Sequence, residues 1–381
     1  MEKEKLKKIS RISWYAVSVF VALMLIVSGY GGMVNPDDTA IPAIIAMTFP
    51  LWLFLSVVLL VTELFLNRLM AIITGASLIL SLGPVLSFCP MNFFPKKLNA
   101  EEKARSFTVM SYNVYGLNDF RSPYSSKDVT MVKQEAKEGR WNQTMKYVLD
   151  RDPDIVCLQE FYLAYNPTFP VLSRDLYQTI CDRYPHRTRM DGAAILSKYP
   201  LYPVDMPDNG DPTFFLTGAI TDIQGRRTLV VSVHLQSIGL SPEDRELYRD
   251  LIKGEGGRKA IREAKTQLLG KLAAAFRHRA NQARLIRHQI DSIGVENVIV
   301  AGDFNDINDC YAMRELSQKE FNDAFTMAGC GPTITYHANR FFFNIDHILY
   351  RGDMEAVGYH KSYFGRSDHY PVEATFLWKK K

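Results

Sequence analysis

Residues 298–306, VIVAGDFND, place an acid and an amide directly after a run of apolar residues. The apolar run predicts a strand buried in the protein. Asp303 and Asn305 come at the end of that strand. Because polar groups at the end of a buried strand need hydrogen-bonding partners, we expect other polar side chains to meet them there.

The same design recurs along the chain, as an apolar strand followed by a side chain that can bind a metal or move a proton. The other stretches are residues 109–117 (VMSYNVYGL) with Asn113, 154–160 (DIVCLQE) with Glu160, 229–237 (LVVSVHLQS) with His234, 344–350 (NIDHILY) with Asp346, and 366–372 (RSDHYPV) with Asp368 and His369. Each has an ordinary explanation too: an asparagine can cap a turn, a glutamate can face solvent, and a histidine can be a satisfied core residue. Taken together, these side chains can supply one another with partners.

The residue types indicate the chemistry of the expected site. Carboxylate and amide oxygens without cysteine suit Mg²⁺ or Mn²⁺, with Ca²⁺ as a further option. The five cysteines form no C-x-x-C pair, so neither a structural zinc site nor a redox motif is indicated. A histidine near such an ion can act as a base or as a donor to a phosphoryl oxygen, and Asp346 is a candidate to orient His369. No serine or cysteine nucleophile stands out, so water is the expected attacking group.

From Ser106 onward, strand-like runs alternate with helix-like segments, among them a helix expected at residues 258–293. This order indicates an α+β or layered α/β fold in which sheets pack on each other with helices outside. The stretch 253–287 is rich in lysine and arginine. It could bind phosphate polymers or an anionic membrane surface, or it could be a solvated helix face. The net charge of +4 is too small to indicate nucleic acid by itself.

Three stretches without charged residues precede this part of the chain. They are residues 12–36, 40–62 and 69–95. Each can supply the roughly 20 apolar residues that a helix needs to cross a bilayer. We therefore expect a membrane region at residues 1–99 with three transmembrane helices, at about 12–34, 41–62 and 69–90. A signal peptide would have a single apolar core, and buried core helices are the remaining alternative.

The distribution of basic residues predicts the orientation of this region. Short cytoplasmic loops carry an excess of lysine and arginine. The N-terminus is basic and the loop at residues 33–40 (MVNPDDTA) is acidic, so the chain should start inside and reach the outside after one span. Three crossings then place everything after Asn99 on the outer face, against which Lys96 and Lys97 argue weakly.

The ordered motifs SYNVYGL, CLQEF, AILSKYP, VSVHLQS, AGDFND, NIDHI and SDHYPV resemble those of the endonuclease/exonuclease/phosphatase superfamily, which has the deoxyribonuclease I-like fold. The resemblance implies a four-layered α/β sandwich over residues 105–381 with one active site between two sheets. It also implies a divalent metal and the hydrolysis of a phosphoester. Tyr115 follows the Asn-Val pair where the abasic-site endonuclease branch commonly has an acid, so this motif is more similar to the sphingomyelinase-type branch.

The resemblance also implies roles for single residues. The implied metal ligands are Asn113, Glu160 and Asp368, with Glu160 as the principal one. The implied catalytic residues are His234, Asp303, Asn305, Asp346 and His369. The implied substrate-binding residues are Asn113, His234 and Asn305. The loops at residues 121–128 and 239–246 flank strand ends, and we expect them to select the substrate.

The sequence therefore predicts a multi-pass membrane protein that hydrolyses a phosphoester, such as a phospholipid head group, with metal-assisted attack by water. A membrane-anchored endonuclease or exonuclease is the first alternative, and a catalytically inactive binding module is the second. The expected partners are the lipid bilayer and a phosphoester: a lipid head group, a nucleic acid or a small phosphate ester. No segment indicates a protein partner.

Overall fold

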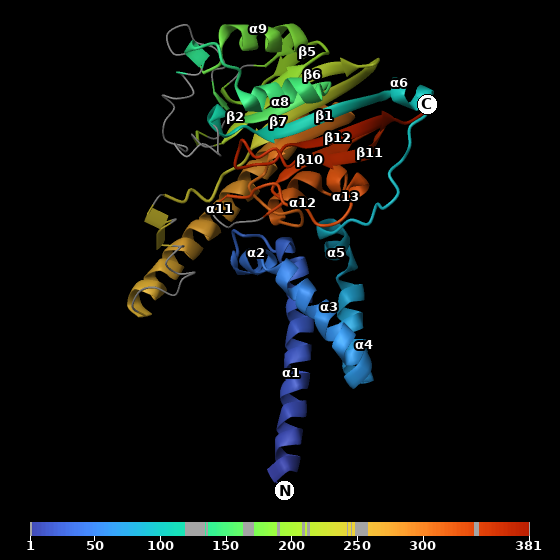
Figure 1. The fold of residues 1–381 in the computed structure, drawn as a ribbon, viewed down its shortest axis with the longest axis vertical. Coiled ribbons are helices and arrows are strands. Elements are labelled where there is room, and N and C mark those ends of the chain that lie inside the picture. The colour runs from blue at the N-terminus through green and yellow to red at the C-terminus, as the bar shows by residue number, and fades with distance from the viewer. Residues whose placement is uncertain are drawn as a thin grey trace.

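The computed structural model combines an N-terminal group of helices with two stacked β-sheets (Figure 1). It describes residues 2–118, 134, 136–162, 171–188, 191–207, 210–211, 214–241, 243–244, 246–247, 258–338 and 343–380. The loop expected at residues 121–128 lies outside the described residues, and the loop at 239–246 is described in part.

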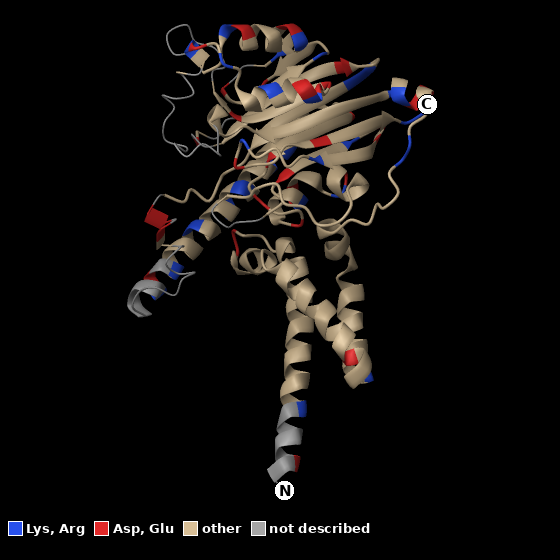
Figure 2. Ribbon diagram, in the orientation of Figure 1, with Lys and Arg blue, Asp and Glu red and all other residues tan. Residues whose placement is uncertain are grey.

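The N-terminal helices, residues 2–88, are called the helical region below. Its elements are α1 (Glu2–Tyr30), the 3-10 helix η1 (Gly31–Met33), α2 (Ile41–Ala46), α3 (Phe49–Leu66), α4 (Arg68–Leu80) and α5 (Leu82–Phe88). α1, α3 and α4 pack against one another and leave large apolar side chains such as Phe54 and Ile72 exposed. From residue 12 to residue 88, the charged residues are Asp37 and Asp38 in the loop before α2, Glu63 in the last turn of α3 and Arg68 at the start of α4, and the rest of these helices is tan in Figure 2. An apolar surface of this kind marks a site of contact with a membrane or another protein.

Among the described residues, two helices are long and apolar enough to cross a membrane, Arg11–Met33 and Phe49–Leu66. The first agrees with the span expected at residues 12–34. The second begins later than the expected 41–62, because residues 41–46 form the separate helix α2 and a new helix starts at Phe49 with Pro50 in its first turn.

The third expected span, at residues 69–90, is not one straight helix. α4 and α5 form a pair bent by 63°. Pro84 lies just after the break and has no N–H to donate to a preceding carbonyl. The Leu80 carbonyl at the break instead accepts a hydrogen bond from the Tyr30 hydroxyl, at 2.6 Å. Within the described residues, the helical region thus has two clear candidate spans, or three if the bent pair counts as one.

The rest of the described chain is called the sandwich below, and it contains two six-stranded sheets. The first sheet has the order β11-β12-β1-β2-β4-β3, with β1 (Ser106–Asn113), β2 (Ile155–Tyr162), β3 (His186–Arg187), β4 (Asp191–Ser197), β11 (Met354–Lys361) and β12 (Val372–Trp378). The second sheet has the order β5-β6-β7-β8-β10-β9, with β5 (Leu201–Val204), β6 (Phe215–Ile223), β7 (Arg226–His234), β8 (Asn297–Asp303), β9 (Asn322–Asp323) and β10 (Asp346–Arg351).

Helices cover the outer face of each sheet. They are α8 (Gln143–Arg151) and α9 (Arg174–Arg183) on the first sheet, and α11 (Arg258–Ile293) and α12 (Tyr311–Ser317) on the second. The shorter elements are α6 (Ala100–Ala104), η2 (Tyr115–Leu117) and α13 (Ala324–Ala328). α11 confirms the helix expected at residues 258–293, and the stacking of helices, sheet, sheet and helices confirms the expected four-layered α/β sandwich.

Side chains of the central strands alternate between two cores. In β2, Ile155 and Cys157 face the core between the sheets, whereas Val156 and Leu158 face the core beneath α8 and α9. β8 alternates in the same way between the inter-sheet core and the core beneath α11 and α12. Strands buried on both faces read as continuous apolar runs, which is why these segments were recognisable in the sequence.

The helical region is docked against the helix-covered side of the second sheet. A Cβ added to Gly32 would lie 1.7 Å from the carbonyl oxygen of Asp309, so the chain passes this point only as glycine. Phe276 of α11 packs on Ala40 and Ala43 at the start of α2. After α5, the Pro90 carbonyl accepts a hydrogen bond from the Gly331 N–H at 2.8 Å.

Figure 2 shows basic residues along α11, and two of them contact the helical region. Arg284 pairs with Asp37 of the loop before α2 at 2.8 Å, and Arg277 donates to the Pro36 carbonyl at 3.1 Å. Arg287 instead pairs with Asp291 within α11, at 2.8 Å. Much of the positive charge in the C-terminal half of α11 therefore holds this chain together, and it does not form a free basic surface.

Candidate active site

Strand pairing brings the predicted site residues to one edge of the two sheets. β1 and β2 run parallel, so Asn113 lies beside Gln159 and next to Glu160. β7 and β8 also run parallel and pair His234 with Asp303. The carboxyl ends of parallel strands meet at the same edge of a sheet. Gly302 allows these two strands to approach, since a Cβ there would lie 1.9 Å from the Val233 carbonyl oxygen.

The remaining predicted residues arrive at this edge from antiparallel strands. Asp346 begins β10 and pairs directly with Asp303 of β8. Asp368 and His369 precede β12, which pairs with β1. The Ser367 hydroxyl donates to the Asn113 carbonyl at 2.7 Å. This bond fixes the segment before β12 to the end of β1.

Glu160 owes its position to a β-bulge. The register between β2 and β4 shifts between Gln159 and Phe161, and Glu160 has φ 53°, in the left-handed region. A bulge adds a residue to one strand and re-aims its side chain, and a non-glycine residue in this region is strained. The side chain keeps 30% exposure, while its neighbours along β2 are buried. The bulge therefore turns Glu160 out of the sheet and into the site.

Asn113 connects the two sheets through its side-chain amide. Its Nδ2 donates to Glu160 Oε1 at 3.1 Å and to Asp303 Oδ2 at 3.0 Å. Its Oδ1 accepts from the Tyr115 N–H at 3.1 Å. The other oxygen of Asp303 accepts from the Asn305 N–H at 2.8 Å, and Asn305 Nδ2 donates to the Leu235 carbonyl at 2.9 Å. Asn113, Asp303 and Asn305 thus hold one another in fixed orientations.

The two histidines reach Asp303 from different sheets: His234 ends β7 of the second sheet, and His369 precedes β12 of the first sheet. His369 Nδ1 contacts Asp346 Oδ2 at 2.8 Å, and its Nε2 lies 3.5 Å from Asp303 Oδ2. Burial lowers the pKa of His369, but the adjacent carboxylates of Asp346 and Asp303 outweigh it and raise the pKa well above the usual value. His234 Nε2 lies 3.6 Å from Asp303 Oδ2 and 4.0 Å from Glu160 Oε1, and its ring stacks on Phe215.

Asp368 lies at the same edge, partly buried, and its Oδ1 lies 3.3 Å from the Ser367 hydroxyl oxygen. Burial, followed by the nearby charges of Glu160 and Asp303, raises the pKa of this carboxyl to about 7, although His369 opposes the change. In the metal-free protein, the Asp368 carboxyl therefore stays protonated at pH values well above those at which an ordinary aspartate loses its proton.

This raised pKa predicts how the metal-free protein responds to pH. Between the unfolded value of about 3.9 and the folded value of about 7, folded Asp368 binds a proton that the unfolded chain has lost. The free energy of unfolding should therefore fall as pH rises through this window. The contribution has a slope of at most about 1.4 kcal/mol per pH unit, reduced by partial exposure.

Asp368→Asn should remove this contribution. We would compare thermal unfolding of the wild-type and variant proteins, both in chelator, at about pH 5 and about pH 7, which span the upper part of this window. The wild type should lose more stability than the variant over this range. An identical pH dependence of the two proteins would contradict the assignment.

The site residues surround a cavity of about 280 Å³, called the site pocket below. Six of the predicted residues line it: Glu160, His234, Asp303, Asn305, Asp368 and His369. Asn113 and Asp346 do not line it but hydrogen-bond to residues that do. The structure therefore brings all eight predicted residues together.

Sequence reasoning missed several residues of the site pocket. Met47, between α2 and α3, lines it from the helical region, and no sequence pattern links it to the strand ends. Tyr336 packs on His369 with ring centroids 5.0 Å apart. Arg279 of α11 is 1% exposed and pairs with Asp306 at 3.0 Å, and it also donates to the Gln236 carbonyl at 3.0 Å. Asp306 stands in the AGDFND motif, which was the available signal. The sequence does not distinguish Arg279 from the other basic residues of α11.

The residue types present fit a divalent cation. The carboxylates of Glu160, Asp303, Asp346 and Asp368 gather around the two histidines, and among the described residues none of the four pairs with lysine or arginine. Carboxylate oxygens are the donors that Mg²⁺ and related ions prefer, and no lysine or arginine of the described residues competes with an ion for them here.

Two subsets of these groups could hold the ion. The predicted ligands are Asn113, Glu160 and Asp368. Ligand atoms of Asp303, Asp346 and His369 also lie within 4.8 Å of one another. In the second subset, Asp346 and His369 already hydrogen-bond to each other, whereas Glu160 is partly exposed to the site pocket. We therefore favour the Glu160 side of the site.

Two family models match this chain. Residues 110–369 match the model of the Endonuclease/Exonuclease/phosphatase family, and residues 10–88 match a model described as a domain of unknown function (DUF8431). No curated protein matches the chain. The family match covers more than half of the chain, which therefore belongs to the endonuclease/exonuclease/phosphatase family. Members of this family are generally phosphoester hydrolases, and they typically use divalent metals.

Several solved structures are similar to this chain at low sequence identity. Truncated TDP2 of Caenorhabditis elegans is 19% identical, with 73% of this chain and 99% of that chain covered and a TM-score of 0.44. An endonuclease/exonuclease/phosphatase of Beutenbergia cavernae is 17% identical, with 72% of both chains covered and a TM-score of 0.46. Sphingomyelinase C of Streptomyces griseocarneus is 18% identical, with 71% and 99% covered and a TM-score of 0.44.

Proposed function

We propose that this chain is a membrane-anchored phosphoesterase that uses Mg²⁺ or Mn²⁺, with Ca²⁺ as a further option. The observation that carries the proposal is the convergence of Glu160, Asp303, Asp368 and two histidines on one pocket. Such a site combines oxygen donors for a cation with groups that donate and accept protons. The proposed reaction adds water to phosphorus and breaks an ester P–O bond, and the departing oxygen takes up a proton.

The residues of the chain have distinct roles in this proposal. A divalent cation held by Glu160, with Asn113 and Asp368 beside it, would draw negative charge from a phosphate oxygen. Asp303 accepts the Asn305 N–H through Oδ1, and its Oδ2 faces both histidines, so it can orient or deprotonate a water molecule. Asn305 would help to hold the phosphate through its side chain.

The two histidines would stabilise the charge that develops on the phosphoryl group. Both Nε2 atoms are turned toward Asp303 at the pocket wall. Asp346 holds Nδ1 of His369, which leaves Nε2 as the atom that meets the substrate. His234 would contact the phosphate directly. Donors of this kind stabilise the transition state most when they are fixed in advance, as the Asp346 contact fixes His369.

The test is hydrolysis by the purified full-length protein in detergent with Mg²⁺ or Mn²⁺. The substrates are bis-p-nitrophenyl phosphate, a phospholipid and plasmid DNA. Turnover that chelator abolishes and added metal restores would support the proposal. Cleavage of DNA alone would support the nuclease alternative. A folded protein that binds metal but turns over none of the three would support the binding-module alternative.

We also propose a division of the chain into a membrane region at residues 1–99 and a catalytic domain at residues 105–381, the latter on the outer face of the membrane. The bent pair α4–α5 serves as the third span in this proposal, and the basic N-terminus stays inside. A phosphatase reporter that works only outside the membrane, fused after Lys381, should be active. A silent reporter on a fusion that is made and inserted would contradict this orientation.

A further inference from the structure

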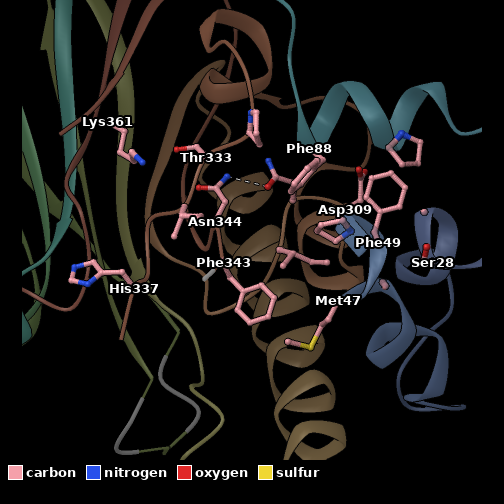
Figure 3. Close-up of a pocket in the computed structure, with 18 of the residues that line it drawn as sticks. Ser28, Met47, Phe49, Phe88, Asp309, Thr333, His337, Phe343, Asn344 and Lys361 are labelled. Atoms are coloured by element: carbon pink, nitrogen blue, oxygen red, sulfur yellow. Dashed lines mark hydrogen bonds between the residues drawn. The ribbon is translucent and has the colours of Figure 1, made fainter. Parts of the chain in front are cut away.

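A second cavity, of about 500 Å³, lies between the helical region and the sandwich (Figure 3). We call it the junction cavity. Its walls on the helical side include Phe49, Pro84 and Phe88, and those on the sandwich side include Thr333 and Ile334. Small-molecule sites are typically cavities of about 300–1,000 Å³ with mostly apolar walls and a few polar groups. The junction cavity has the size and the lining of such a site.

The junction cavity adjoins the site pocket. Met47, Ile307 and Phe343 line both of them. Ile307 follows Asp306 in the loop that carries Asp303 and Asn305, and Met47 lies between α2 and α3. The two cavities are therefore neighbours, and these three apolar side chains lie at their common boundary.

The junction cavity lies at the ends of the candidate spans. Ser28 and Gly29 are in the last turns of the span Arg11–Met33, and Phe49 is the first residue of the span Phe49–Leu66. Phe88 ends the bent pair. If these helices cross a bilayer, the cavity lies at the level of the membrane surface on the side of the sandwich. A lipid can reach it there without leaving the membrane completely.

The wall contains a buried amide oxygen, Asn344 Oδ1, to which the described residues offer no donor. Asn344 is 7% exposed, and its Nδ2 donates to Asn308 Oδ1 at 3.0 Å, the bond drawn in Figure 3. Its Oδ1 is buried and accepts no hydrogen bond from the described residues. A buried acceptor without a donor is costly, so an occupant that carries a hydroxyl or an amide N–H would satisfy it.

We propose that the substrate is a lipid phosphoester whose apolar chain occupies the junction cavity while its phosphate lies in the site pocket. This inference rests on the proposed function. It assigns the substrate class through a binding site that the helical region and the sandwich form together. A nucleic acid has no long apolar group to fill this cavity, which makes the lipid the better occupant.

The test compares two substrates with the same phosphodiester head group, one with long acyl chains and one with short chains that is soluble in water. The full-length wild-type protein should show a kcat/KM at least about tenfold higher for the long-chain substrate, since each methylene group moved from water into an apolar site favours binding. Thr333→Trp, which fills the cavity from the sandwich side, should lower this ratio at least fivefold. Thr266→Trp is the matched control, because Thr266 is exposed on α11 away from both cavities, and it should leave the ratio unchanged.

A second variant tests the same prediction in case Thr333→Trp does not fold. Ile334 lines the cavity but is 37% exposed, so Ile334→Trp should be easier to accommodate and should lower the ratio in the same direction. Equal rates on both substrates in the wild type would overturn the inference. So would a folded Trp variant that keeps the wild-type ratio. Turnover of DNA and of bis-p-nitrophenyl phosphate without turnover of either lipid would contradict the lipid substrate. It would still support the proposed phosphoesterase activity. No turnover of any phosphoester would instead count against the proposed function.

Discussion

Glu160→Gln is expected to lower kcat by about 10³ and to weaken Mn²⁺ binding strongly, while the protein stays folded. The substitution keeps the size of the side chain but removes the negative charge that the bulge in β2 turns into the site. A metal ion contributes several kcal/mol of charge stabilisation to the transition state, and each 1.36 kcal/mol corresponds to about a factor of ten in rate. Steady-state kinetics and Mn²⁺ titration on the same preparation would measure both effects.

Glu138→Gln is the matched control, because the Glu138 side chain is 45% exposed and pairs with Arg140 at the surface. It should have wild-type activity and metal affinity. If Glu160→Gln binds Mn²⁺ as tightly as the wild type does, Glu160 is not the principal ligand. The ion would then belong with Asp303, Asp346 and His369, whose ligand atoms also lie close together.

Most of the candidate site could be predicted from the sequence because its residues follow strands with a strong signal. The β2 and β8 runs are apolar at successive positions, since one face meets the inter-sheet core and the other meets a helix layer. The β8 run ends at Asp303, the last residue of the strand, and the β2 run meets its first polar residue at Gln159, three residues before the strand ends at Tyr162. Residues that carry chemistry at those ends, such as His234 and Asp303, are therefore visible without a structure.

The rest of the site depends on contacts that no local pattern encodes. The bulge at Glu160 is a register shift between β2 and β4, so it is a property of a strand pair. Arg279 reaches Asp306 from a helix whose other basic residues look the same in sequence. Met47 meets the site pocket only because the helical region docks on the sandwich near Gly32 and Asp309. The break between α4 and α5 was also not predicted, although Pro84, just after it, was a local signal that hydropathy alone does not register.

His369→Ala is expected to lower kcat by about 10²–10³, the usual loss for one donor to a developing oxyanion. Asp346→Asn should have a smaller effect on kcat but a distinct effect on the pH profile. The Asp346 carboxylate raises the pKa of His369, which keeps the imidazole protonated to higher pH. If protonated His369 is the donor, activity falls as pH rises through that pKa. Removing the carboxylate should move this fall in activity to lower pH.

A second Asp–His pair in the same fold provides the control for Asp346→Asn. His347 is also fully buried, and its Nδ1 lies 3.2 Å from Asp323 Oδ2, but His347 does not line the site pocket. Asp323→Asn should therefore lower stability and leave the alkaline fall in activity where it is. If Asp346→Asn changes stability alone, as Asp323→Asn does, then Asp346 supports the fold and does not tune His369. A shift of the pH profile in Asp346→Asn alone would identify Asp346 as the positioning residue, because only that pair has its second imidazole nitrogen turned toward Asp303 and the pocket.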